Sequence, residues 1–220
     1  MTEIEAIRAR HSVRRYKDAA IEKEKIDLLN ACIDECNATG KLHFQLCEDA
    51  GNTFNRLLNK AMGLGSAPSV IACIGPDDSD LDARIGYYGQ KIVLYAQQLG
   101  LNTCWAGTYN KKGISAKVGE GERLVLVIAI GYGENQGKPR KSRTAAQVSK
   151  CEGDRPEWFD FAVEMALLAP TAINQQKFEI MLGKDGVVTF TDKGGVHSKV
   201  DLGIVRYNFE IGEKYAKNRE

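Results

Sequence analysis

A short basic segment near the start of the chain carries the side chains best suited to bind an anion. It reads Arg10-His11-Ser12-Val13-Arg14-Arg15-Tyr16 and follows a helix that a Thr2–Glu5 capping box predicts. Arginine donates hydrogen bonds in a planar fork and does not lose its charge, so it binds phosphate in a defined geometry. The neighbouring histidine and hydroxyl groups add further donors. The segment therefore predicts a phosphate-binding site at the end of this helix.

A second basic cluster, Lys138-Pro139-Arg140-Lys141-Ser142-Arg143, directly follows the most apolar predicted strand. The whole chain has 30 basic and 29 acidic side chains and a net charge of only +1. This balance leaves no general positive surface for nucleic acid or an anionic membrane, so the two clusters indicate a local anion site. Within the clusters, we expect Arg15 and Arg140 to be solvated.

Four residues have a spacing that zinc could use, namely Cys32, Cys36, His43 and Cys47. Cys32 and Cys36, however, fall on the apolar face of a predicted helix, so we interpret the cysteines as buried reduced thiols and expect no metal. The longest apolar run, residues 124–130, is far shorter than the roughly 18 residues of a membrane-spanning helix. The charged N-terminus does not resemble a signal peptide. We therefore expect a cytoplasmic protein that does not contact a membrane.

Hydrophobic periodicity predicts helices alternating with strands along the whole chain. The predicted helices cover residues 2–10, 22–38, 52–62, 81–99, 156–168 and a stretch that starts at 201, and the predicted strands cover 41–48, 69–74, 103–105, 124–131, 178–182 and 187–191. Residues 138–150 show no periodicity and are expected to form a surface connection. This order of elements predicts a layered α/β or α+β fold.

The second part of the chain weakly repeats the first. The alternating residues 42–49 match residues 178–185 at a constant offset, and residues 84–87 resemble residues 201–204 at the head of a long helix. Chance readily explains a match of alternating apolar residues. The recurring order of helix, strand and helix nevertheless indicates an internal pseudo-twofold arrangement.

Five segments of the chain carry a common resemblance. Gly131-Tyr132-Gly133 is not a dinucleotide fingerprint, because a basic segment and not an apolar helix follows it. The other four segments are Arg10 to Arg14, the helix and loop from Gly86 to Gly107, Lys141-Ser142-Arg143, and Ala169-Pro170-Thr171-Ala172-Ile173-Asn174-Gln175-Gln176. Together the five segments resemble motifs of the nitroreductase family of FMN-dependent oxidoreductases, in which a turn similar to residues 131–133 ends a strand. The resemblance implies an α+β nitroreductase fold with a central mixed or antiparallel sheet flanked by helices.

The resemblance also implies roles for individual residues toward FMN. Those expected to hold the phosphate are Arg10, Ser12, Lys141 and Arg143, with His11 beside them. Arg14 would lie at the pyrimidine edge, where a cation stabilises the reduced flavin. Ala106 and Gly107 would offer backbone N–H groups to the flavin ring. Those expected to close the site are Pro170, Thr171, Asn174 and Gln176. Catalysis needs no side-chain acid or base, because flavin N5 carries the chemistry.

The position of the Ala-Pro-Thr motif departs from the common pattern of the family. In most members the corresponding motif lies within the first ~50 residues and completes the partner subunit's flavin site. Here it lies at 169–176, as in the smaller TM-nitroreductase branch, and Lys177 replaces the usual proline. We therefore expect a pseudo-dimer in which residues 1–150 carry the phosphate site and residues 151–220 complete the flavin crevice. Such a chain would bind one FMN and would be a monomer or a weak homodimer.

The implied activity is electron transfer from NAD(P)H through FMN to a small acceptor such as a nitroaromatic or a quinone. A second hypothesis is a flavin carrier or redox regulator without NAD(P)H turnover, because relatives with one fold perform different flavin chemistry. A third hypothesis is a zinc-stabilised interaction domain built on the four cysteine and histidine residues. Bound metal without a visible chromophore would distinguish this third class.

Overall fold

The computed structural model describes residues 1–50, 53–54 and 67–219 and divides the chain into two compact units. The four-stranded unit comprises Ala9–Leu81 and Lys91–Pro139. The three-stranded unit comprises Met1–Arg8, Asp82–Gln90 and Arg140–Glu220. Neither unit is continuous in sequence. The expected division at residue 150 instead cuts the chain into two consecutive parts, according to what each part contributes to the flavin site. That division stays a prediction.

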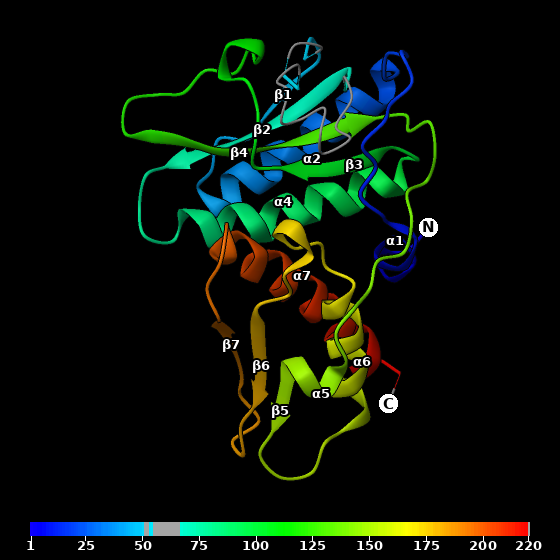
Figure 1. Ribbon diagram of the computed structural model, residues 1–220, viewed down its shortest axis with the longest axis vertical. Coiled ribbons are helices and arrows are strands. Elements are labelled where there is room, and N and C mark those ends of the chain that lie inside the picture. The colour runs from blue at the N-terminus through cyan, green and yellow to red at the C-terminus, as the bar shows by residue number, and fades with distance from the viewer. Residues whose placement is uncertain (51–52, 55–66, 220) are drawn as a thin grey trace. The chain divides into compact units, whose positions relative to one another are not determined.

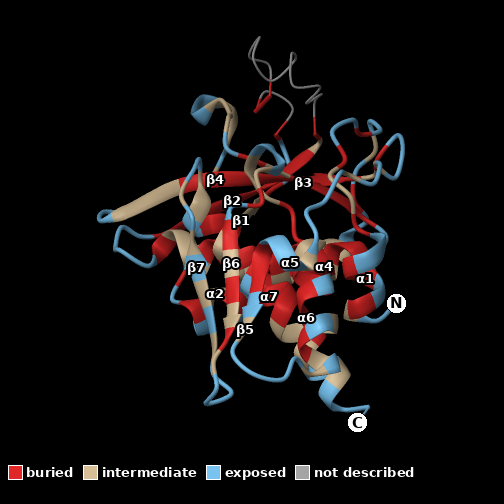
Figure 2. Ribbon diagram, turned by 60° about the horizontal axis from the view of Figure 1, so that its bottom comes forward, coloured by how far each residue is buried: buried red, intermediate tan, exposed pale blue. Residues whose placement is uncertain are grey.

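The four-stranded unit is built on an antiparallel sheet with the strand order β1-β2-β4-β3 (Figure 1). Its strands are β1 (Gln45–Cys47), β2 (Ser69–Pro76), β3 (Asn102–Ala106) and β4 (Glu122–Gly131). β2 and most of β4 are buried along their length (Figure 2). Their near-continuous apolar sequence follows from this burial, because a strand covered on both faces needs no polar alternation.

Two layers cover the faces of this sheet. On one face, Val70 and Ala129 form a core with Val13 and Tyr16 of the basic segment. The other face is covered by α2 (Lys23–Gly40) and by the second half of α4 (Leu81–Gln98), as Figure 1 shows. Lys91 Nζ, 2.7 Å from Glu35 Oε1, joins these two helices. The sheet is thus the rigid support on which the basic segment is mounted.

The three-stranded unit combines a mixed sheet with two long helices. Its sheet has the order β5-β6-β7, in which β5 (Ser149–Cys151) pairs parallel with β6 (Phe178–Leu182), and β6 pairs antiparallel with β7 (Val188–Asp192). The helices are α6 (Glu157–Leu167) and α7 (Ser198–Lys217). Phe209 of α7 packs edge-on against Phe159 and Phe190, with ring centroids 5.8 and 5.3 Å away. These aromatic contacts are part of the core of the unit.

Two glycines let α7 approach the first half of α4 closely. A Cβ atom added to Gly86 would lie 2.0 Å from the Val200 carbonyl oxygen, and one added to Gly203 would lie 2.1 Å from the Ala83 carbonyl oxygen. The contact is reciprocal, since each glycine faces the carbonyl three residues before the other. The resemblance between residues 84–87 and 201–204 therefore corresponds to a shared helix crossing. The pseudo-dimeric arrangement as a whole stays a prediction.

Most expected elements are present, with differences at their ends. The capping box is confirmed at the head of α1 (Glu3–Ala9), where Thr2 N donates to Glu5 Oε2 at 2.8 Å and Glu5 N donates to Thr2 Oγ1 at 3.3 Å. The strand expected at 41–48 forms a ladder only over β1. The helix expected at 52–62 falls almost entirely outside the described residues. The final helix begins at Ser198, three residues earlier than expected.

The expectation of an unstructured connection up to residue 150 was wrong at its end. Residues 145–151 form the short helix α5 (Ala145–Val148), which begins with a capping box at Thr144, and then β5. β5 has only three residues, and its pairing with β6 is long-range. Its formation therefore depends on a partner strand that no local pattern reveals.

Candidate functional site

The basic segment lies along the free edge of β3. Val13 N donates to Thr103 O at 3.0 Å, and Ser12 forms a parallel bridge with the same residue. The Tyr16 hydroxyl donates to Val13 O at 2.7 Å, which fixes the turn inside the segment. Residues 10–16 thus extend the sheet beside β3, the strand that ends in Ala106, one of the residues predicted to contact the flavin ring.

The end of β4 holds the other side of the basic segment. Lys17 N donates to Tyr132 O at 2.8 Å, and Glu134 N donates to Arg15 O at 3.0 Å. A Cβ atom on Gly133 would lie 2.8 Å from Val13 Cγ1 and 2.5 Å from Asn135 O, so the turn needs glycine here. The Gly131-Tyr132-Gly133 turn therefore positions the basic segment.

Arg10 and Arg14 of the segment lie near Cys104 in the middle of β3. Burial raises the pKa of the Cys104 thiol, while the positive charges of Arg14 and Arg10 and a hydrogen bond with Ser12 oppose that rise. Arg10 is only 3% exposed, which is unusual for an arginine, whereas Arg14 is exposed. Arg10, Ser12 and Arg14 therefore each lie near enough to Cys104 to affect its pKa.

The remaining predicted residues of this unit lie near the same strand. Ala106 ends β3 and is buried, and Gly107 follows it and is exposed. His11 is partly buried, and its Cβ lies 2.6 Å from the place where a Cβ on Gly137 would stand. The four-stranded unit therefore contains one predicted set, which consists of Arg10, His11, Ser12, Arg14, Ala106 and Gly107.

In the three-stranded unit, the second basic cluster is bonded to the Ala-Pro-Thr segment. Asn174 Nδ2 and Gln176 Nε2 donate to Lys141 O at 2.9 and 3.2 Å. Arg143 N donates to Gln176 Oε1 at 2.8 Å. Among the described residues, the side-chain nitrogens of Lys141 and Arg143 make no hydrogen bond or ion pair, and both side chains are exposed. The unit therefore presents two uncompensated cations on a backbone that neighbouring amides hold in place.

The loop that carries this network has an uncommon backbone. Ile173, Asn174 and Gln176 have φ values of 46°, 57° and 47°, in the left-handed region that side chains other than glycine rarely adopt. A β-branched residue such as Ile173 is strained there, and its side chain is 80% exposed. Strain of this kind persists only where surrounding contacts fix the conformation, and it clusters at functional sites.

Asp201 at the head of α7 is one of the contacts that fix this loop. Its carboxylate accepts hydrogen bonds from Ala172 N at 2.9 Å and from Gln175 Nε2 at 2.7 Å. Burial raises the pKa of Asp201 to about 6, although both hydrogen bonds favour its charged form, and the nearby Asp192 carboxylate raises the pKa further. Pro170 is buried, and Thr171 Oγ1 accepts from Gln176 N at 3.1 Å. The second predicted set, Lys141, Arg143, Pro170, Thr171, Asn174 and Gln176, thus lies in the three-stranded unit.

The expectation that Arg140 is solvated was wrong. Its Nη2 donates to the carbonyl oxygens of Leu167 and Ala169 at 2.8 and 2.5 Å, and burial lowers the pKa of its guanidinium group. A cation at this position satisfies carbonyls that the end of α6 leaves without helical partners. Arg140 therefore joins the start of the basic cluster to the residue that precedes Pro170.

The residues that suggested zinc do not assemble into one cluster. Cys32, Cys36 and Cys47 are buried free thiols. His43 Nδ1 lies 2.9 Å from Glu122 Oε2, so the imidazole pairs with a carboxylate. In the described part of the chain, no group of three or more cysteine, histidine or acidic residues could hold a metal ion.

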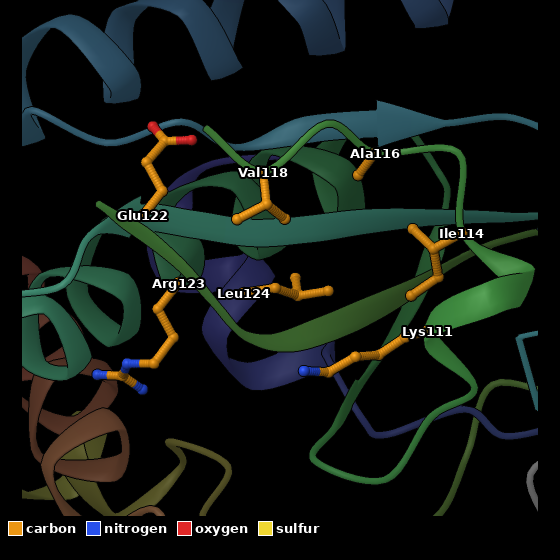
Figure 3. Close-up of a pocket in the computed structure, with 7 residues that line it drawn as sticks. All are labelled: Lys111, Ile114, Ala116, Val118, Glu122, Arg123 and Leu124. Carbon is orange, nitrogen blue, oxygen red and sulfur yellow. The ribbon is translucent and has the colours of Figure 1, made fainter. Parts of the chain in front are cut away.

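A hollow of about 320 Å³ lies beside the start of β4 (Figure 3). Its wall combines apolar and charged side chains, and Arg123, one of its cations, pairs through Nε with Asp77 Oδ1 at 2.7 Å. The residues that line it are Lys111, Ile114, Ala116, Val118, Glu122, Arg123 and Leu124. The hollow therefore contains none of the residues predicted to bind FMN.

Comparison with known proteins identifies the class. The family model described as "Putative TM nitroreductase" matches residues 3–213, so the chain belongs to this nitroreductase family. No curated protein matches the sequence. No described helix is both long enough and apolar enough to cross a membrane.

Solved structures of similar fold agree with this assignment. A structure named as a nitroreductase from Thermotoga maritima has a TM-score of 0.69 and 24% identity and covers 100% of this chain and 87% of its own. One named NADH dehydrogenase/NAD(P)H nitroreductase, from Bacteroides thetaiotaomicron, has a TM-score of 0.52 and 22% identity over 66% of this chain and 95% of its own. One named NADH oxidase, from Clostridium acetobutylicum, has a TM-score of 0.50 and 24% identity over 65% of this chain and 96% of its own. The α+β nitroreductase fold expected from the sequence is confirmed.

Sequence reasoning did not find three residues that hold the site in place. Asp201 appeared only as part of a helix-start motif, Arg140 as a surface charge, and Ser142 only inside the basic cluster. Their spacing in sequence carries no signal, because each bonds to residues 26–34 positions away. Asp201 lies in the first turn of α7, where an acidic residue is common, so its type gave no sign of a buried role.

Proposed function

We propose that this protein is an FMN-dependent oxidoreductase that takes hydride from NAD(P)H and passes electrons to a small acceptor. The observation that carries the proposal is the pair of uncompensated cations, Lys141 and Arg143, held beside the strained 170–176 loop of a nitroreductase-family chain. Exposed cations on a fixed backbone fit a phosphate monoester, whose charge repays their desolvation. This donor set therefore suits the phosphate of FMN.

The basic segment supplies the remaining cationic groups in this proposal. Arg10 and Ser12 bind the phosphate together with Lys141 and Arg143, and His11 lies beside them. Arg14 lies at the pyrimidine edge of the flavin ring. Its exposed guanidinium stabilises negative charge that develops there on reduction and so raises the potential. The proximity of Arg10, Ser12 and Arg14 to Cys104 supports this grouping.

The backbone and the loop position the ring. Ala106 and Gly107 donate backbone N–H groups to its polar edge, and glycine permits a close approach. Pro170, Thr171 and Asn174 cover the ring from the side of the loop, whose strained conformation gives them a fixed placement. Preorganised contacts of this kind lower the cost of binding, because little freedom is lost when the ligand arrives.

Bound FMN supplies the redox chemistry, accepting hydride at N5 and transferring electrons onward. The chain's own residues bind, orient and electrostatically tune the cofactor, and none of them acts as an acid or base. Structural neighbours are named NAD(P)H nitroreductase and NADH oxidase, which supports a nicotinamide donor here. A nitroaromatic or a quinone is the expected acceptor. A flavin carrier without nicotinamide turnover would share the binding site but not this reaction.

Flavin content tests the binding proposal directly. Protein reconstituted with excess FMN and then desalted should show a flavin absorption spectrum and about one FMN per chain. Replacement of a phosphate-binding cation, Arg143→Met, should lower the FMN content after desalting. Arg15→Met, which removes an equal charge from an exposed side chain, should leave it unchanged. A wild-type protein that retains no FMN would contradict the proposal.

A further inference from the structure

The side-chain amide of Gln176 is fully occupied by bonds within the protein. Its Oε1 accepts from Arg143 N at 2.8 Å and from Ser142 Oγ at 3.1 Å. Its Nε2 donates to Asn174 Oδ1 at 2.9 Å and to Lys141 O at 3.2 Å. A glutamine amide has two acceptor sites and two donor hydrogens, so no capacity remains for a ligand. The residue is also only 3% exposed.

These bonds reach three successive residues of the basic cluster. Gln176 bonds to the carbonyl of Lys141, the hydroxyl of Ser142 and the amide of Arg143. The side chains of Lys141 and Arg143 project from this fixed backbone without partners among the residues that the structure describes. The buried amide of Gln176 therefore fixes the backbone from which the side chains of Lys141 and Arg143 extend.

The backbone of Gln176 is held as firmly as its side chain. Its φ of 47° is costly for a residue other than glycine, so the conformation depends on compensating contacts. Gln176 N donates to Thr171 Oγ1 at 3.1 Å, which closes the loop on itself. The arrangement is thus built to present the amide to residues 141–143.

We propose that Gln176 is a positioning residue that preorganises Lys141 and Arg143 for the flavin phosphate and does not itself touch the cofactor. The inference rests on the proposed FMN site. Long basic side chains lose conformational freedom when they bind an anion, and a fixed backbone lowers that cost. Gln176 thereby contributes to affinity for the phosphate alone.

FMN and riboflavin distinguish this role from a general structural one, since riboflavin lacks the phosphate. Apo-protein with the near-isosteric change Gln176→Met is titrated with each flavin, and binding is followed by flavin fluorescence. The dissociation constant for FMN should rise roughly tenfold, as expected when charged contacts lose their geometry, while that for riboflavin stays unchanged. An equal rise for both flavins, or no rise for either, would overturn the proposal.

A matched control and a double variant sharpen the result. Gln45→Met removes a comparable amide that bonds to the Lys117 backbone on both sides, at 2.7 and 3.0 Å, in the four-stranded unit, and should change neither constant. In a Lys141→Met/Arg143→Met background, Gln176→Met should cause no further loss of FMN affinity, because it acts through those cations. A further loss of the full size would show that Gln176 contacts the cofactor itself.

Two other outcomes are separable. If Gln176→Met does not fold, Ser142→Ala, which removes only the hydroxyl bond to Oε1, replaces it. This change should weaken FMN binding roughly threefold with riboflavin unchanged, and equal FMN affinities would overturn the proposal. Wild-type protein that binds neither flavin contradicts the proposed function. If wild-type protein binds FMN and the Gln176→Met variant binds it with the same dissociation constant, only this inference is contradicted.

Discussion

Asp201 shows how a buried charge can hold a loop at a cost to stability. Its carboxylate is the acceptor for both Ala172 N and Gln175 Nε2, yet the residue is only 6% exposed. Burial raises its pKa to about 6 from an ordinary value of 3.8. Between these two values the folded protein binds a proton that the unfolded chain does not, so protonation favours the folded state there.

The free energy of unfolding should therefore respond to the change Asp201→Asn in a pH-dependent way. The stabilising contribution of this group is present below about pH 4 and is lost as the pH rises through about 6. Relative to wild type, the asparagine variant should gain roughly 2.5 kcal/mol in free energy of unfolding between pH 4 and pH 7, from about two pKa units at 1.36 kcal/mol each. Urea unfolding at several pH values measures the difference. If the difference in free energy of unfolding between the two proteins does not change with pH, the pKa of Asp201 is not raised in the folded protein.

At the scale of elements, the reciprocal contact of Gly86 and Gly203 decides how closely α7 can pack against the first half of α4. Glycine lowers the stability of an isolated helix by about 1 kcal/mol relative to alanine. Its presence in both helices is explained by the backbone atoms that a Cβ would meet, at 2.0 Å for Gly86 and 2.1 Å for Gly203. Packing here overrides helix propensity.

The change Gly203→Ala should thus destabilise the protein although it favours the helix. A methyl group against the Ala83 carbonyl and the Tyr87 amide cannot be relieved by a side-chain movement. We expect a loss of more than about 3 kcal/mol in the free energy of unfolding, measured by urea denaturation. Gly119→Ala, whose Cβ would meet only side-chain atoms of Glu122, the nearest at 3.0 Å, and no backbone, should change it by less than about 1 kcal/mol. Similar losses in both variants would refute this explanation.

Elements were predictable from the sequence where their signal is local. The Thr2–Glu5 capping box and the strand predicted from the long apolar run of β4 are both present in the structure. β5 and the side-chain bonds of Arg140 were missed because both depend on partners distant in sequence. The four cysteine and histidine residues that suggested zinc have a ligand-like spacing in sequence but do not form one cluster, since His43 pairs with Glu122.

At the scale of the whole molecule, the family and its fold were predictable because five motifs occur in order along nearly the entire chain. The assignment of individual residues to FMN stays a prediction, and each unit contains one of the two predicted sets. The role of each residue within a set could not be predicted from the sequence. Gln176 has the type and position of a ligand contact, and only its four bonds to neighbouring groups show that its amide is occupied.

The central claim is that bound FMN mediates electron transfer from a nicotinamide to a small acceptor. Anaerobic addition of NADH or NADPH to the FMN-loaded protein, followed by a nitroaromatic or a quinone, tests it in one absorbance trace. We predict that the yellow flavin band disappears with at least one donor and returns when the acceptor is added. A bound flavin that stays oxidised with both donors would contradict the oxidoreductase and leave a flavin carrier in its place.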